Sequence, residues 1–225
     1  MANPHQGKWE KRWHPLREEW VVYATHRNQR PWSFDLKKHG HEAPEYDPAC
    51  YLCPGNRRQG SALNPDYTDV FVFDNDFPVV GMTAPDIAPE YASLHDGLYR
   101  RAAGKGIARV VCYAREHNAS LATVPLARME RVFEVWQAEM AFFEKHPDIH
   151  SVLIFENKGE IVGVSNPHPH CQIYAVDFPL QLMEREELAA KNYRQRPSRN
   201  LFDDIVAAEL KDELRIVADN EHAVA

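Results

Sequence analysis

The sequence predicts a fold of the α+β class, and two features of its residue pattern support this prediction. Short runs rich in β-branched and aromatic residues, which are typical of strands, recur along the chain. One long segment and two shorter ones near the C-terminus carry apolar residues at helical spacing. The expected strands are residues 20–24, 69–73, 109–113, 152–155 and 173–175, and the expected helices are residues 125–145, 183–193 and 202–214.

The composition is that of a chain that can bury a sizeable core. It has 225 residues, of which 44% are hydrophobic and 26% charged, and its formal net charge is −7. This charge argues against broad binding to nucleic acid or to an anionic membrane, but it allows a local basic site. No apolar run approaches the length of a membrane span, and residues 1–15 lack a signal-peptide core, so we expect a cytoplasmic protein.

The longest predicted helix has a proline at its start and another after its end. Pro125 suits a first helical turn, and Pro147 cannot continue a helix. Apolar residues recur on one stripe of the segment, so we expect that stripe to face the core and assign it no function. The stripe consists of Leu126, Met129, Val132, Phe133, Trp136, Met140 and Phe143.

Cys50 and Cys53 form a Cys-x-x-Cys pair whose context indicates a metal site. A redox-active pair usually opens a helix after a strand, whereas this pair leads into the turn formed by residues 54–56. Four cysteines, only two of them closely spaced, do not make a disulfide framework. Zinc needs four ligands, and spacing alone does not select the other two among the 12 histidines.

The segment 163–175 presents two histidines and a glutamine together. Pro167 and Pro169 hold the residue before each of them extended, because the proline ring disfavours the helical region there. Alternate residues of an extended segment share a face, so His168, His170 and Gln172 should point to one side. An imidazole can act as a nucleophile, base or metal ligand near neutral pH. A solvated surface loop is the alternative, but the repeated His-Pro unit favours a functional site.

Residues 165–172 read Ser-Asn-Pro-His-Pro-His-Cys-Gln, and this resembles the active-site signature of the galactose-1-phosphate uridylyltransferase family. That family is a branch of the histidine-triad superfamily in which Gln stands where the hydrolases have a third His. Further segments match in the family's order: residues 27–32, 50–56, 64–68, 73–77 and 155–159.

The resemblance implies a histidine-triad-like antiparallel sheet with flanking helices, as the first of two repeats. Residues 1–212 would form this domain. Residues 219–225 echo residues 74–80, and a strand-like run, residues 214–217, precedes them. We therefore expect a second repeat, missing here, to begin at residues 213–225.

The resemblance also assigns roles within the His-Pro segment. His170 matches the family nucleophile, which would attack the α-phosphorus of UDP-glucose and then pass UMP to galactose-1-phosphate. The backbone carbonyl of His168 is expected to hold the proton on the other ring nitrogen of the nucleophile. Gln172 and Ser165 are expected to donate hydrogen bonds to phosphate oxygens.

The same resemblance completes the metal site. It supplies His117 and His168 as partners of Cys50 and Cys53, which would give a structural zinc four protein ligands. Glu186 falls where the family places a carboxylate ligand of a second metal, iron or zinc, whose other ligands would lie beyond residue 225. A solvated helix face is the alternative interpretation of Glu186.

Substrate contacts follow from the resemblance as well. The family's matching arginines, here Arg27 and Arg30, reach across a homodimer interface to the partner's nucleotide phosphates. Segment 74–78 would hold uridine, with an aromatic ring on the base and an acid on the ribose hydroxyls. The residues implied in substrate binding are Arg27, Arg30, Leu52, Phe73, Asn75, Asp76, Phe77, Val110, Asn157, Gly163, Ser165 and Gln172.

The expected function is therefore transfer of UMP between UDP-glucose and galactose-1-phosphate, by a ping-pong mechanism in galactose metabolism. One alternative is a related dinucleoside-polyphosphate phosphorylase or nucleotidyl hydrolase. A second is a non-catalytic module that binds zinc and nucleotide. Intact Ser165, His170 and Gln172 argue against the second alternative.

Overall fold

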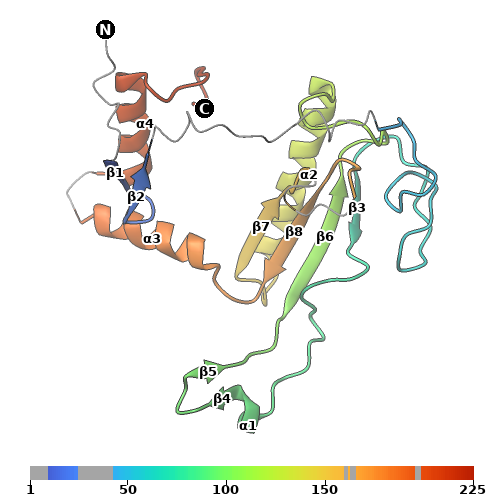
Figure 1. Cartoon of the computed structure of the whole chain (residues 1–225), viewed down its shortest axis with the longest axis horizontal. Coiled ribbons are helices and arrows are strands. Elements are labelled where there is room, and N and C mark those ends of the chain that lie inside the picture. Colours follow the sequence, from blue (N-terminus) through green and yellow to red (C-terminus); the bar gives the residue numbers. More distant parts are fainter. Residues whose placement is uncertain (1–9, 25–42, 160–161, 163–165, 196–198) are drawn as a thin grey trace. The chain divides into compact units, whose positions relative to one another are not determined.

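The computed structural model describes residues 10–24, 43–159, 162, 166–195 and 199–225, and it divides the chain into two compact units (Figure 1). One unit combines Met1–Phe34 with Leu180–Ala225, and the other is Asp35–Pro179. Among the described residues, no helix combines the length and the apolar character that crossing a bilayer requires.

The unit Asp35–Pro179 is built on a four-stranded antiparallel sheet, as the sequence predicts. Its strand order is β3 (Phe71–Asp74), β6 (Gly106–Cys112), β8 (His170–Val176) and β7 (Ser151–Phe155). The two long strands in the middle pair from Gly106 with Val176 to Cys112 with His170. The predicted strand 173–175 is thus the second half of a longer strand, which begins at His170 and ends at Val176.

The two faces of this sheet have different partners. Helix α2 (Leu126–Glu144) lies across one face (Figure 1), where Val132 and Phe143 pack against Val111, Ile173 and other buried residues of the sheet. Side chains alternate along a strand, so His170 and Gln172 lie on the opposite face. The helix therefore covers one face of the sheet, while the loop that carries Cys50 and Cys53 packs against Val110 and Cys112 on the face that carries His170 and Gln172.

Helix α2 matches its predicted bounds, but its apolar stripe is only partly buried. Val132 and Phe143 are fully buried, whereas Leu126, Phe133 and Met140 are respectively 74%, 52% and 43% exposed. The sheet contacts only a narrow arc of the helix, and these three residues, spaced seven apart, lie outside it. The prediction that the whole stripe faces the core is wrong for these positions.

The sequence did not predict the short helix and the small hairpin that lie between β3 and β6. They consist of α1 (Pro89–Ala92), β4 (Ser93–Leu94) and β5 (Tyr99–Arg100), with β4 and β5 paired antiparallel. The intervening turn places His95, Asp96 and Gly97 at positive φ. Elements of two residues carry too little periodicity for a sequence pattern to reveal them.

The other unit contains a hairpin and two helices. Strand β1 (Glu10–His14) pairs antiparallel with β2 (Glu19–Tyr23), and α3 (Gln181–Tyr193) precedes α4 (Leu201–Asp212). Asn200 caps α4 by accepting a hydrogen bond from the backbone N–H of Phe202 at 3.1 Å. The bounds of both helices agree with the sequence prediction within two residues.

The C-terminal residues do not form the strand expected at 214–217. The segment instead folds back on itself, with an isolated bridge between Asp219 and Val224 and a hydrogen bond from the Val217 N–H to the Ala225 carbonyl at 2.7 Å. The proposal that residues 213–225 begin a second repeat stays a prediction.

Gly106 should be intolerant of any side chain. A Cβ atom at this position would lie 2.4 Å from the backbone oxygen of Ala175 in the paired strand, and neither backbone can yield without breaking the β6–β8 ladder. We expect Gly106→Ala to lower the free energy of unfolding by roughly 1–3 kcal/mol, the usual cost of overpacking. Gly81→Ala is the matched control, since nothing lies within 4 Å of its Cβ position. Equal denaturant midpoints for the two variants would contradict this prediction.

Candidate functional site

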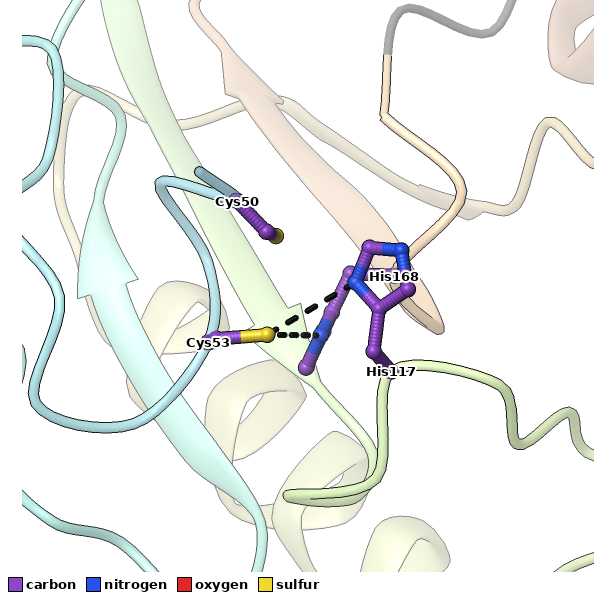
Figure 2. A group of neighbouring side chains, drawn as sticks. All are labelled: Cys50, Cys53, His117 and His168. Atoms are coloured by element: carbon purple, nitrogen blue, oxygen red, sulfur yellow. Dashed lines mark hydrogen bonds between the residues drawn. The ribbon is translucent and has the colours of Figure 1, made fainter. Parts of the chain in front are cut away.

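Two cysteines and two histidines from three distant segments meet in the interior of the unit Asp35–Pro179. The ligand atoms of Cys50, Cys53, His117 and His168 all lie within 4.8 Å of one another, and all four residues are buried. Figure 2 shows Cys53 pointing at both imidazoles, with S···N contacts of 3.6 Å to each Nδ1 atom. The structure thus brings together the four zinc ligands that the resemblance implies.

The distances from Cys53 to the two imidazoles fit tetrahedral zinc coordination. Zinc–sulfur and zinc–nitrogen bonds of usual length, at a tetrahedral angle, separate the S and N ligand atoms by about 3.6 Å. Both S···N distances at Cys53 have this value. All cysteines within the described residues are free thiols, so no disulfide occupies Cys50 and Cys53. Two soft sulfurs and two imidazoles are a common donor set for structural zinc.

Polar neighbours orient the imidazole of His168 for metal binding. Its Nε2 atom lies 3.0 Å from the backbone oxygen of Ala114 and 2.9 Å from the Tyr67 hydroxyl, which itself donates to the Leu52 carbonyl at 2.6 Å. A proton on Nε2 satisfies the Ala114 oxygen and leaves the Nδ1 lone pair directed at the cluster. Burial lowers the pKa of His168 to about 4, so the ring is neutral, as a metal ligand must be.

The sulfur side of the cluster has its own support. The Nδ2 group of Asn166 donates to Cys50 Sγ at 3.3 Å, and its Oδ1 atom accepts from the backbone N–H of His168 at 2.9 Å. The Leu52 N–H also points at Cys50 Sγ, at 3.3 Å. Burial raises the pKa of the Cys53 thiol to about 11, which disfavours an isolated thiolate. A divalent cation would offset this cost by binding the thiolate directly.

His170 begins strand β8, next to the cluster. Its Nδ1 atom lies 2.7 Å from the backbone oxygen of His168, the contact expected from the sequence. Since a carbonyl only accepts, Nδ1 carries a proton, and in the neutral ring the lone pair is then on Nε2. The residue is only partly buried, so this lone pair can reach a ligand. One residue therefore serves two sites, because His168 offers its ring to the metal cluster and its carbonyl to His170.

Gln172 follows His170 on the same face of β8. It pairs with Val110 of β6 and with Phe155 of β7, so it lies between two other strands of the sheet. Its Oε1 atom accepts a hydrogen bond from the Tyr174 hydroxyl at 3.0 Å. Its amide group can therefore donate toward a ligand bound beside His170.

Three of the residues that the resemblance implies in substrate binding, Leu52, Phe73 and Val110, lie together. Leu52 and Val110 are buried in one cluster, and Phe73 packs against it. Phe73 stacks on Phe71 with ring centroids 5.2 Å apart, and the guanidinium of Arg58 lies 4.2 Å from the Phe73 ring centroid. Arg58 was not singled out from the sequence, since a loop arginine there gives no local signal.

The segment after β3 presents the predicted ribose-binding residues at the end of the sheet. Asn75 caps the turn by accepting from the Phe77 N–H at 2.9 Å, and Phe77 is 66% exposed. Asp76 lies 3.4 Å from Arg58 Nε and accepts from the Gly60 N–H at 3.3 Å. The carboxylate of Asp76 is thus fixed by a neighbouring loop rather than free in solvent.

The remaining predicted site residues are not part of the clusters described above, or they lie outside the described residues. Asn157 follows β7 as an exposed residue, two positions after Phe155. Glu186 is half-buried on α3, and the metal-binding group found among the described residues does not include it. Arg27, Arg30, Gly163 and Ser165 lie outside the described residues, so their roles stay predictions.

Three residues that organise the site were missed by sequence reasoning. Tyr67 and Asn166 support the metal cluster, and Arg58 holds Asp76. Tyr67 and Asn166 do lie inside segments that resemble the family, at 64–68 and 165–172. Their presence in those segments was the available signal, but their contacts depend on parts of the chain far away in sequence.

Comparison with known proteins agrees with this architecture. Residues 2–179 match the family model described as galactose-1-phosphate uridyl transferase, N-terminal domain. The galactose-1-phosphate uridylyltransferase of Haemophilus influenzae is 38% identical over 216 residues, which cover 96% of this chain and 60% of that protein. The rat enzyme is 34% identical over 222 residues, which cover 98% of this chain and 56% of that protein.

Solved structures of related proteins have the same fold as this chain. A uridylyltransferase structure superposes with a TM-score of 0.65 at 25% identity, covering 94% of this chain and 59% of that one. An Arabidopsis thaliana ADP-glucose phosphorylase with bound ADP-glucose has the same fold, with a TM-score of 0.67 at 19% identity, covering 96% of this chain and 62% of that one.

The antiparallel sheet and the fold that it shares with these solved structures define a protein of the histidine-triad-like class. The chain belongs to the galactose-1-phosphate uridylyltransferase family. It spans about 60% of the length of the curated relatives it matches.

The metal cluster should bind one zinc ion per chain. We expect elemental analysis of protein purified without chelator to find one equivalent, and Cys53→Ser to lose it, because a hydroxyl is a poor ligand beside two imidazoles. Cys171→Ala is the matched control, since Cys171 is also buried but packs in the other core, against α2. Native protein without bound metal, or full occupancy in Cys53→Ser, would show that the cluster is not a zinc site.

Proposed function

We propose that the chain carries the uridylyl-transfer site of a UDP-glucose:hexose-1-phosphate uridylyltransferase. The observation that carries this proposal is the 2.7 Å contact between His170 Nδ1 and the His168 carbonyl. In the neutral ring this contact places the proton on Nδ1 and the lone pair on Nε2, as a nucleophile requires. Family membership supports UDP-glucose and galactose-1-phosphate as the substrates.

The reaction proceeds in two displacements. His170 Nε2 attacks the α-phosphorus of UDP-glucose, a nitrogen–phosphorus bond forms, and the bond to the oxygen of glucose-1-phosphate breaks. A phosphate oxygen of galactose-1-phosphate then attacks the same phosphorus, and UDP-galactose leaves with the electron pair of the nitrogen–phosphorus bond returned to Nε2. The Nδ1 proton stays on the ring throughout, hydrogen-bonded to the His168 carbonyl, and stabilises the charged imidazole of the intermediate.

The neighbouring residues hold the nucleotide and its phosphates. Gln172 donates its amide hydrogens to a phosphoryl oxygen, and Ser165 donates to the phosphate of the entering or leaving sugar. Phe73 and Phe77 supply aromatic surface for the uracil ring. Asp76, fixed by Arg58 and Gly60, accepts hydrogen bonds from the ribose hydroxyls.

Zinc would act structurally here rather than as a Lewis acid. Cys50, Cys53, His117 and His168 would fill its four positions, which leaves none for substrate. Its contribution would be to hold the backbone of His168, and hence the carbonyl that orients His170. Glu186 stays a proposed ligand of a second metal, with the remaining ligands supplied by another part of the protein.

Replacement of His170 tests the nucleophile directly. We expect His170→Ala to lose all uridylyl label after incubation with UDP-glucose radiolabelled in the α-phosphate, while it still binds UDP-glucose, because the pocket is unchanged. His222→Ala is the control, since that imidazole is 81% exposed. Acid-labile, alkali-stable label on the native chain would identify a phosphoramidate. Label that persists in His170→Ala would exclude this residue as the nucleophile.

The same label separates the rival reactions. A uridylyltransferase should take up the label from UDP-glucose. It should then lose the label to galactose-1-phosphate rather than to water or inorganic phosphate. Discharge by water would indicate a hydrolase, and discharge by phosphate with labelling from diadenosine polyphosphates would indicate a phosphorylase. Nucleotide binding with no label from any donor would indicate a binding module.

Arg27 and Arg30 are proposed to serve the site of the neighbouring chain in a homodimer. We expect the double variant Arg27→Ala, Arg30→Ala to bind UDP-glucose roughly tenfold or more weakly without unfolding, since guanidinium–phosphate pairs contribute about 1.5–3 kcal/mol. At a UDP-glucose concentration that labels the native chain but leaves this variant largely unlabelled, mixed dimers of the variant with His170→Ala should regain label, because each dimer then holds one intact site. Heterodimers of proven composition that stay unlabelled would place the arginines in the site of their own chain.

A further inference from the structure

Tyr174 is a polar residue of β8 that the mechanism above does not use. Its hydroxyl donates to Gln172 Oε1 at 3.0 Å, and the two residues lie two positions apart on the face that also carries His170. This hydrogen bond joins Gln172, which is proposed to bind the phosphoryl group, to Tyr174, which lies farther along β8 from His170.

The contact determines what Gln172 can offer a substrate. A carboxamide has one acceptor oxygen and two N–H donors, at opposite ends of one planar group. Phosphoryl oxygens only accept, so the oxygen end of the amide would repel them and the nitrogen end would bind them. Since Tyr174 binds the oxygen end, the nitrogen end is the one left for a phosphate beside His170.

Tyr174 is itself held by the sheet. Its ring meets Phe155 of β7 edge to face, with centroids 4.9 Å apart and an interplanar angle of 77°. It pairs with Ala108 of β6 on one side and with Leu153 of β7 on the other. Aromatic packing of this kind restricts the ring, so the hydroxyl keeps a fixed position relative to Gln172.

We propose that Tyr174 is a positioning residue that sets the amide of Gln172 with its N–H groups toward the phosphoryl group carried by His170. The inference rests on the proposed uridylyl transfer and deepens it. Without the hydroxyl, the amide rotates between its two orientations, and one of them presents an oxygen to the phosphate. Removal of the hydroxyl should lower the rate of the covalent step more than it lowers the affinity for nucleotide, because the charge on the phosphoryl oxygens changes in that step.

A double-mutant cycle on the full chain tests this inference. Tyr174→Phe removes the hydroxyl and keeps the ring on Phe155, and the measured quantity is the single-turnover rate of uridylyl-His170 formation at saturating UDP-glucose. We expect Tyr174→Phe to lower this rate roughly threefold to tenfold, the effect of one lost hydrogen bond. Gln172→Ala should lower it at least as much, and adding Tyr174→Phe to Gln172→Ala should lower it no further.

Two controls separate positioning from general damage. Tyr99→Phe, on the exposed hairpin strand β5, should label at the native rate. The dissociation constant for UDP-glucose and the thermal midpoint of Tyr174→Phe should stay close to the native values. A native labelling rate in Tyr174→Phe, or effects of the two substitutions that multiply in the double variant, would overturn the inference.

A second measurement decides the role of Tyr174 without relying on turnover. Nitrogen-15 NMR with UMP as the probe reports the side-chain amide of Gln172, identified by its absence in Gln172→Ala. We expect a single sharp pair of amide signals that shifts on addition of UMP, and an averaged or broadened pair in Tyr174→Phe. Identical spectra for the two proteins would overturn the inference. Absence of label in the native chain would contradict the proposed function, and these spectra would still decide the role of Tyr174.

Discussion

The cluster of Cys50, Cys53, His117 and His168 is the constraint on which the rest of the site depends. It joins a loop before β3, a segment after β6 and the segment that enters β8. Because the His168 ring belongs to the cluster and the His168 carbonyl bonds to His170, fixing the cluster also fixes the tautomer of the neighbouring imidazole. A structural cation here would thereby control the chemistry of a residue that it does not touch.

The cluster can be buried because its polar atoms have partners. Tyr67 bridges the Leu52 carbonyl and the His168 ring, and Asn166 joins Cys50 Sγ to the His168 backbone. An unpartnered polar group in such a place would cost roughly 1–3 kcal/mol. These contacts explain why the segments around the cluster carry Tyr and Asn where an ordinary core would carry only apolar residues.

The two faces of strand β8 carry different kinds of side chain. Cys171, Ile173 and Ala175 point into the core against α2, where they contribute packing. His170, Gln172 and Tyr174 point to the other face, where each makes a polar contact along the strand. A one-residue shift of register would exchange these two sets, so the hydrophobic core also determines which face carries His170, Gln172 and Tyr174.

The sequence by itself determined the class of fold, the helices α2, α3 and α4, and the His-Pro segment that leads into β8. These features are encoded locally, since helical spacing, proline position and a short motif are all visible within a few consecutive residues. The tertiary structure alone decided which residues surround that motif. The roles of Tyr67 and Arg58 and the exposed part of the α2 stripe depend on contacts between segments far apart in the chain. Such contacts are set by packing and strand pairing, which no local pattern records.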